Sequence, residues 1–178
     1  MESDTNKKNS YIHVYTGNGK GKTTAALGLA LRACGAGKKV FIAQFVKGKI
    51  YSEIKAINEF LNLITVKQYG LDCFIYNKPS KADIEAAQNG LLEVQEVINS
   101  AKYDVLILDE ANIALYYNLF SIEEFIKLIK SRANNLEIII TGRYAPKEII
   151  EIADLVSEIK EVKHYYTKGV EARKGIEY

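Results

Sequence analysis

Short apolar runs alternate with longer amphipathic stretches along the chain, and this alternation predicts strands separated by helices. The apolar runs predict six strands, at residues 11–15, 39–45, 63–68, 105–108, 136–141 and 155–160. Stretches of helical period predict helices at 23–35, 52–61, 80–101, 121–133 and 146–153. The run VLIL at 105–108 does not alternate, which is typical of a central parallel strand covered by helices on both faces. We therefore expect an α/β fold with a doubly wound, mostly parallel six-stranded sheet, whose ligand site lies beyond the carboxyl ends of the strands.

Local signals mark several helix ends. Gly35 and Gly37 are stop signals after the first helix, and Ser80 is suited to cap the helix that follows Pro79. The spacing S-x-x-E at 121–124 predicts a capping box, and Pro146 is suited to the first turn of a short helix.

Length and composition limit the class of protein. The chain has 178 residues, 48% hydrophobic and 26% charged, which describes one ordinary globular domain over residues 11–178. No run reaches the roughly 18 apolar residues that span a bilayer. The polar N-terminus, MESDTNKKNS, lacks the apolar core of a secretory signal, and two cysteines do not suggest a disulfide framework. We expect a cytoplasmic protein without membrane contact, whose residues 1–10 are disordered.

Positive charge is concentrated near the start of the chain. The formal net charge is only +2, but residues 1–40 contain seven lysines and arginines against two acidic residues. This excess surrounds one glycine-rich segment instead of forming a basic stripe over the whole domain. It therefore favours a small anionic ligand over a nucleic acid.

The segment TGNGKGKTT, residues 16–24, lies between a predicted strand and a predicted helix, as a phosphate-binding loop requires. Gly17, Gly19 and Gly21 allow backbone N–H groups to point at an anion, while Lys22 supplies a charge and Thr23 a hydroxyl for Mg²⁺. The alternative is a glycine turn that binds nothing, but such a turn does not need Gly-Lys-Thr at a helix start.

The loop departs from the usual pattern G-x-x-x-x-G-K-T in one position. Thr16 stands where the first glycine is expected, so the loop is effectively one residue shorter. We therefore expect nucleotide binding, but without the γ-phosphoryl transfer of ordinary kinases and GTPases.

Further polar residues follow two other buried strands. Asp109 and Glu110, directly after VLIL, form a Walker-B-like pair that would help to hold Mg²⁺; the alternative is a solvated pair of acids. Thr141 and Gly142 lead to Arg143, whose guanidinium would reach a phosphate unless it is an ordinary surface arginine. His13 fits a hydrogen-bonded strand position better than a catalytic one.

Three segments together carry a resemblance to a known family. They are VYTGNGKGKTTAALGLALRACGAGKKV, YDVLILDE, and the C-terminal stretch ITGRYAPKEIIEIADLVSEIKEVKHYYTKGVEARKGIEY. Together they resemble the P-loop ATP:corrinoid adenosyltransferases, also called cob(I)yrinic acid a,c-diamide or cob(I)alamin adenosyltransferases, over Tyr11 to Tyr178. The short phosphate loop joined to the tail K-H-x-Y-x-K-G-x-x-A-x-x-G-I-x-Y makes the similarity specific.

The resemblance implies a RecA-like P-loop fold, a homodimer, ATP with Mg²⁺, and a flavoprotein reductant. The implied reaction transfers the 5′-deoxyadenosyl group of ATP to the cobalt of a reduced corrinoid and releases triphosphate. By the same resemblance Lys22 and Glu110 are catalytic, and Thr23, Glu110 and Asp109 serve the metal. The implied nucleotide-binding residues are those of the loop with one arginine: Gly17, Asn18, Gly19, Lys20, Gly21, Lys22, Thr23, Thr24 and Arg143.

One branch of the family has a G-F-x-W element that crowds the lower face of the corrinoid. The corresponding stretch here, YGLDCFIYNKPS at 69–80, has no tryptophan. We expect Phe74, with Tyr69 or Tyr76, to take this role.

Two other functions fit the same motifs. A P-loop ATPase or small-molecule kinase would use Glu110 to position a water or a hydroxyl and would release ADP. A binding module would sense ATP, or deliver the finished cofactor, without turnover. The products distinguish these functions, because only adenosyl transfer yields triphosphate without ADP.

Overall fold

The computed structural model describes residues 10–71, 75 and 78–178, and one parallel sheet forms its centre. The strands stand in the order β3-β2-β4-β5-β1-β6, and each pairs with its neighbours in the parallel sense. Their bounds are β1 Ile12–Thr16, β2 Val40–Phe45, β3 Ile64–Tyr69, β4 Val105–Asp109, β5 Glu137–Thr141 and β6 Leu155–Glu158. The predicted doubly wound α/β sheet is confirmed.

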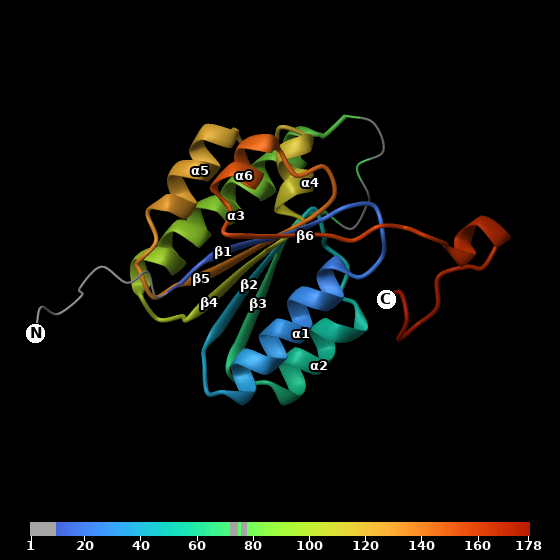
Figure 1. The fold of residues 1–178 in the computed structure, drawn as a ribbon, viewed down its shortest axis with the longest axis horizontal. Helices are drawn as coiled ribbons and strands as arrows, with labels where there is room; N and C mark the ends of the chain where they lie inside the picture. Colours follow the sequence, from blue (N-terminus) through green and yellow to red (C-terminus); the bar gives the residue numbers. More distant parts are fainter. Residues whose placement is uncertain (1–9, 72–74, 76–77) are drawn as a thin grey trace, which may run out of the picture.

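Helices cover both faces of this sheet (Figure 1). On one face lie α1 (Lys22–Gly35) and α2 (Ser52–Phe60). The other face carries α3 (Lys81–Ser100), α4 (Ala111–Tyr116), α5 (Ile122–Lys130) and α6 (Lys147–Ile152). Each face has its own buried apolar cluster, with Ile42, Ile107 and Ile139 on the α1 side and Phe41 and Leu108 on the α3 side. The central strands β2, β4 and β5 are buried on both sides, which explains their continuous apolar runs.

The register of the sheet brings three strand ends together. β5 lies between β1 and β4, with Val14 opposite Ile140 and Ile140 opposite Leu108. Because all strands run in one direction, the residues that follow β1, β4 and β5 emerge at the same edge of the sheet. This edge is where a ligand site of a doubly wound sheet is expected.

The sequence located the predicted elements to within a few residues, but it missed one helix. α4 is six residues long, and its N-cap residue, Glu110, is left-handed with φ 58° and makes no side-chain cap. Its sequence therefore has none of the usual start signals. The predicted sixth strand ends two residues early, at Glu158, where the chain continues toward the phosphate loop.

The helix-end predictions were mostly right. Ser80 forms a reciprocal capping box with Asp83 at the start of α3. The predicted box at α5 is only half present: Ser121 Oγ accepts a hydrogen bond from the Glu124 N–H, but the return contact is lacking between these two described residues. Pro146 lies directly before α6.

Two predictions concern residues outside the described part of the chain. Residues 1–9, which were expected to be disordered, lie outside the described residues. The same prediction is wrong for Ser10, which is buried and whose Oγ donates to the Asn134 carbonyl at 2.8 Å. Phe74 and Tyr76 likewise lie outside the described residues. Among the helices that are described, none combines the length and apolar character needed to cross a membrane.

Candidate active site

The phosphate loop lies between β1 and α1, and its lysine is turned inward. Lys22 is buried, and its Nζ donates to the carbonyl oxygens of Gly17 and Gly19, both at 2.7 Å. Burial lowers the pKa of Lys22, whereas the charge of the nearby Glu110 carboxylate acts in the opposite direction and raises it. The loop thus holds one charged ammonium at the helix N-terminus, where N–H groups and the helix dipole also favour an anion.

The loop requires glycines for two different structural reasons. Gly21 caps α1 with φ +125°, a conformation that residues with a Cβ rarely adopt. At Gly17 and Gly19 an added Cβ would lie 2.4 Å from the Ile159 carbonyl oxygen and 2.8 Å from the Lys160 carbonyl. The loop is therefore packed tightly against the chain that leaves β6, and the Gly19 N–H donates to the Ile159 carbonyl at 2.8 Å.

Asp109, at the end of β4, joins the phosphate loop to three strands. Its carboxylate is 1% exposed and accepts four hydrogen bonds. The donors are Thr23 Oγ1 at 2.9 Å, Thr141 Oγ1 at 2.6 Å, Gln44 Nε2 at 3.0 Å and Lys47 Nζ at 2.8 Å. These contacts occupy both oxygens, so Asp109 acts as the centre of a network that holds Thr23 in place.

The charge of Asp109 is balanced by Lys47. Burial alone would raise the pKa of Asp109, but the charge and hydrogen bond of Lys47, with the hydroxyls of Thr141 and Thr23, lower it. Burial likewise opposes the charge of Lys47, whose pKa is nevertheless raised by Asp109 and Glu110. Both groups are therefore charged at neutral pH, and Lys47 Nζ also lies 3.1 Å from Thr23 Oγ1.

Glu110 lies beside Asp109 but has different surroundings. Burial raises the pKa of Glu110, and the charge of Asp109 adds to this, whereas Lys47, Lys22 and Arg143 oppose it. Within the described part of the chain no hydrogen bond engages its carboxylate, and it lines a cavity of about 1130 Å³ together with the phosphate loop. Glu110 is thus the carboxylate that is free to bind a ligand.

The residues at this edge fit a magnesium ion. Thr23 Oγ1 and the Glu110 carboxylate are hard oxygen donors lining one cavity, as Mg²⁺ prefers. Among the described residues, no cluster of three or more His, Cys, Asp or Glu side chains is placed to hold a metal. A Mg²⁺ bound by one or two protein oxygens and completed by phosphates and waters does not need such a cluster.

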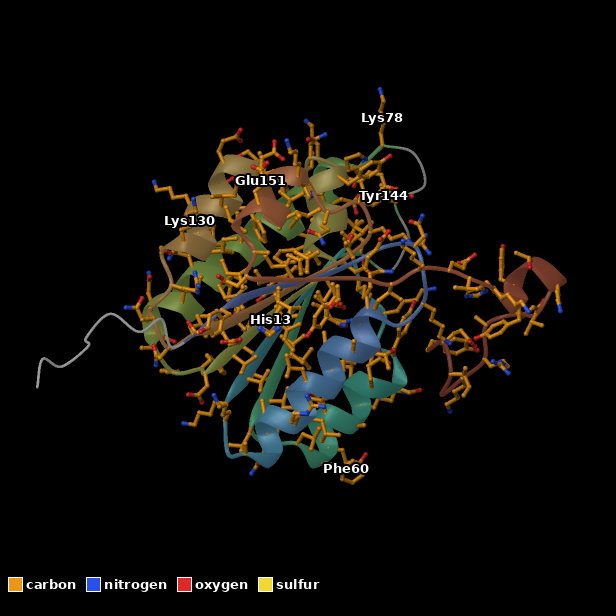
Figure 2. All side chains as sticks on the ribbon, viewed as in Figure 1. His13, Phe60, Lys78, Lys130, Tyr144 and Glu151 are labelled. Atoms are coloured by element: carbon orange, nitrogen blue, oxygen red, sulfur yellow. The ribbon has the colours of Figure 1, made fainter. Side chains whose placement is uncertain are left out.

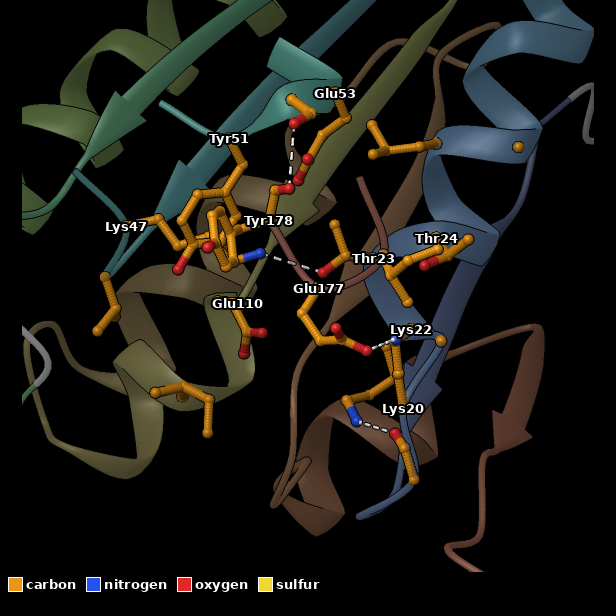
Figure 3. Close-up of a pocket in the computed structure, with 18 of the residues that line it drawn as sticks. Lys20, Lys22, Thr23, Thr24, Lys47, Tyr51, Glu53, Glu110, Glu177 and Tyr178 are labelled. Atoms are coloured by element: carbon orange, nitrogen blue, oxygen red, sulfur yellow. Dashed lines mark hydrogen bonds and ion pairs between the residues drawn. The ribbon is translucent and has the colours of Figure 1, made fainter. Parts of the chain in front are cut away.

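The remaining predicted site residues also come to this edge. Asn18 and Arg143 line the same cavity, as do Lys20 and Thr24, which are labelled in Figure 3. Arg143 is exposed and its Nη2 donates to the Asn18 carbonyl at 3.4 Å. The Lys20 ammonium lies against residues of the C-terminal segment, as described below. The structure therefore brings together the sequence-predicted residues of the loop, the acid pair and Arg143.

Sequence reasoning missed Lys47, Gln44 and the pair Tyr51 and Tyr178. Lys47 and Gln44 are at the carboxyl end of β2, which pairs with β4, so the same rule that singled out Asp109 applies to them. Tyr51 and Tyr178 both line the cavity, and their ring centroids are 6.3 Å apart. Nothing in the sequence pattern indicates that contact, because 126 residues separate the two.

Of the three aromatic residues expected beneath a corrinoid, Tyr69 lies within the described residues, whereas Phe74 and Tyr76 do not. Its ring packs against Phe45, with ring centroids 5.7 Å apart, and its hydroxyl donates to Glu93 on α3 at 2.9 Å. Gly90 of α3 makes room for this ring, because a Cβ there would lie 2.5 Å from Tyr69 Cγ. Tyr69 therefore serves the packing of α3 on the sheet.

Tyr144, Lys130 and His13 lie at different places relative to the cavity (Figure 2). Tyr144 lies near the phosphate loop, whereas Lys130 at the end of α5 points outward on the opposite side. His13, within β1, contacts Glu137 with 2.7 Å between Nε2 and Oε1. It is thus a strand residue whose imidazole contacts a carboxylate at hydrogen-bonding distance, as predicted, and it is not among the residues that line the cavity.

Comparison with known proteins agrees with this arrangement. Residues 8–178 match the family model described as "ATP:corrinoid adenosyltransferase BtuR/CobO/CobP". The chain is 37% identical over 168 residues to the corrinoid adenosyltransferase of Escherichia coli (strain K12), covering 94% of this chain and 85% of that protein. It is 36% identical to corrinoid adenosyltransferase CobA of Salmonella typhimurium (strain LT2), with the same coverage.

A more distant relative also matches over the full chain. The corrinoid adenosyltransferase of Sinorhizobium sp is 30% identical over 188 residues, which cover 100% of this chain and 84% of that protein. The chain therefore belongs to the ATP:corrinoid adenosyltransferases, enzymes that transfer an adenosyl group from ATP to a corrinoid.

Proposed function

We propose that this chain transfers the 5′-deoxyadenosyl group of ATP to the Co(I) centre of a reduced corrinoid in the cavity beside the phosphate loop. The observation that carries this proposal is the hydrogen bond of 2.9 Å between Thr23 and Asp109. It joins the loop that would hold a triphosphate to the acid pair that would serve its metal.

The triphosphate is assigned to the loop. Gly17 to Thr24 would surround it with backbone N–H groups, with Lys22 as the central charge and Arg143 at the outer side. Lys47 adds a second ammonium next to Thr23. Three cations around one anionic group stabilise negative charge as it develops on a leaving group.

Mg²⁺ would be held by Thr23 Oγ1 and the carboxylate of Glu110. When bound, the ion neutralises charge on the triphosphate. Asp109 is the supporting residue, because its four hydrogen bonds fix the position of the Thr23 hydroxyl and balance the charge of Lys47.

The reaction balances without a general base. The electron pair of Co(I) attacks C5′ of ATP and forms the cobalt–carbon bond, while the C5′–O bond breaks and its electron pair leaves with triphosphate. Since no proton is removed, the reaction needs no His or Cys dyad. The chain's part is to place C5′ in line with cobalt and to stabilise the departing anion.

The proposal extends to the assembly and its surroundings. Residues 11–178 would act as a single domain, in a cytoplasmic homodimer that receives its corrinoid reduced by a flavoprotein. Light scattering coupled to gel filtration tests the dimer, and adenosylation of cob(II)alamin with a reduced flavodoxin tests the reductant.

The deciding experiment is an anaerobic incubation with ATP, Mg²⁺ and chemically reduced cob(I)alamin. Absorbance follows the cobalt–carbon product, and chromatography separates the phosphate products. Adenosylcobalamin with equimolar triphosphate is the expected result. ADP with phosphate and an unaltered corrinoid would contradict the proposal and favour an ATPase or kinase; unaltered ATP would favour a binding module.

A further inference from the structure

The last fifteen residues return to the phosphate loop. After β6 the chain extends away from the sheet, forms the 3₁₀ turn η1 (Tyr165–Lys168), and comes back so that its end lies near the N-terminal end of α1 (Figure 1). Residues 175–178 line the same cavity as the phosphate loop. The motif that made the sequence resemblance specific is therefore part of the site.

One anchor of this segment is a lysine of the phosphate loop. Lys20 Nζ lies 2.7 Å from Glu177 Oε1 and 3.0 Å from the Tyr165 hydroxyl. The Tyr165 hydroxyl in turn donates to Glu177, and the Arg173 N–H donates to Glu177 Oε2 at 2.7 Å. These hydrogen bonds lower the pKa of Glu177, that of Lys20 most strongly.

The other anchor is at the start of α2. Ser52 Oγ donates to the Tyr178 carbonyl at 3.0 Å, and the Tyr178 ring lies against that of Tyr51. Residues 175–178 thus reach from the phosphate loop to α2 and line the cavity together with both (Figure 3).

The two lysines of the loop are therefore used differently. Lys22 is buried and bonded to loop carbonyls, whereas the side chain of Lys20 is 40% exposed and its ammonium contacts Glu177 and Tyr165 of the C-terminal segment. An ion pair this exposed stabilises only weakly, because water screens both charges. A segment held by a few such contacts can be shifted between docked and undocked forms by a single substitution.

We propose that Lys20 is a positioning residue, which acts by docking residues 164–178 over the cavity instead of binding phosphate itself, and that the docked segment forms the outer wall of the ATP site. This inference rests on the proposed function only for the identity of the nucleotide. Glu177 is its partner in the same role.

A double-mutant cycle separates this role from direct phosphate binding. We expect Lys20→Met and Glu177→Gln each to weaken ATP binding about three- to tenfold by calorimetry, with no further loss when they are combined. If Lys20 bound phosphate directly, Lys20→Met alone would weaken binding. Glu177→Gln would then leave it unchanged or tighten it, and either result would overturn the proposal.

Docking itself is measured without substrates. Millisecond hydrogen exchange of the peptide covering 164–178 is expected to be faster in both variants and to be restored in the charge exchange Lys20→Glu with Glu177→Lys. Lys174→Met, at an exposed position of the same segment, is the matched control. Unchanged exchange in the single variants would overturn the proposal even if the enzyme is active. Because the exchange measurement uses no substrate, its result does not depend on whether the enzyme transfers an adenosyl group.

Discussion

Asp109 and Glu110 are adjacent carboxylates with opposite surroundings. Asp109 accepts four hydrogen bonds and its pKa is lowered, while Glu110 is raised in pKa by burial and keeps its carboxylate toward the cavity. The difference comes from the backbone. Asp109 ends a buried strand, whereas Glu110 takes a left-handed conformation, φ 58°, that turns the chain into α4. Two adjacent residues thus differ: the Asp109 carboxylate is saturated with hydrogen bonds, whereas Glu110 lines the cavity.

Asp109→Asn is expected to destabilise the protein by about 2–4 kcal/mol. It leaves Lys47 without its counter-charge, and it replaces one acceptor oxygen with an NH₂ group that can only donate. Urea unfolding of the variant and the wild type measures the loss. Glu110→Gln, the matched control, should change stability by less than about 1 kcal/mol, since its carboxylate has no hydrogen bond among the described residues. It should instead abolish the Mg²⁺ dependence of ATP binding. Equal stability losses in both variants would contradict this assignment.

The contribution of Asp109 should depend on pH in a defined direction. Its pKa is lowered in the folded state, so the stability it adds is present above the ordinary aspartate pKa, about 3.9, and is lost as the pH falls through the lowered value. The difference in unfolding free energy between wild type and Asp109→Asn should therefore be constant from pH 7 to about 5 and shrink below about 4. A difference that grows on acidification would mean that the carboxylate is not stabilised by its neighbours.

Lys22→Ala is expected to abolish ATP binding and turnover, because it removes the buried ammonium at the helix N-terminus together with its hydrogen bonds to the loop carbonyls. Calorimetry with ATP and the adenosylation assay both measure this. Lys38→Ala, an exposed lysine after α1, removes the same charge outside the site and should bind ATP normally. An unchanged rate in Lys22→Ala would mean that the nucleotide binds elsewhere.

At the scale of elements, the phosphate loop depends on the chain that follows β6. Gly17 and Gly19 are in backbone contact with residues 159–160, and the Ile159 N–H donates to the Thr16 carbonyl at 2.8 Å. β6 itself is a short edge strand, four residues long and exposed along its length. Its role is to bring the C-terminal segment onto the loop, which ties two ends of the chain to one site.

Gly17→Ala is expected to destabilise the protein by about 2–4 kcal/mol, since a Cβ would meet the Ile159 carbonyl at 2.4 Å in a backbone with φ +97°. Chemical unfolding measures the effect. Gly35→Ala, near the end of α1, has open space and should be neutral or stabilise by up to about 1 kcal/mol. If Gly17→Ala is as stable as wild type, the loop does not rest on this contact.

At the scale of the whole molecule, one edge of the sheet collects residues from the beginning, the middle and the end of the chain. The phosphate loop follows β1, the acid pair follows β4, and Glu177 and Tyr178 arrive from the C-terminus. The site is therefore complete only when the sheet has formed, so ligand binding and folding are thermodynamically linked.

This linkage predicts a large ligand effect on stability. Mg²⁺–ATP at about 100 times its Kd should add about 2.7 kcal/mol to the free energy of unfolding. For a chain of this size that corresponds to a rise in Tm of about 5–10 °C. Differential scanning calorimetry measures the shift, and Lys22→Ala with the same ligand provides the control. A wild-type shift no larger than that of the control would contradict a folded-state ATP site at this edge.

Much of the fold and part of the site could be predicted from local pattern. Strands such as Ile138–Ile140 are apolar without interruption because both faces are covered, and the glycines and Lys22 have a spacing that only a phosphate loop requires. α4 was missed because it begins at a left-handed residue without a polar cap. The contacts of Lys47 with Thr23 and Asp109 could not be predicted, because these partners are 24 and 62 residues away in sequence.

The sequence by itself determined the parallel α/β sheet, the phosphate loop, the acid pair and the family, because each depends on residue type at short spacing. The tertiary structure alone decided which carboxylate is saturated and which is free, and which lysine faces inward and which holds the C-terminal segment. Those outcomes depend on strand order, β5 between β1 and β4, and on contacts such as Lys20 with Glu177, 157 residues apart. Short sequence patterns do not indicate such long-range contacts, because these form only when the whole chain folds around its core.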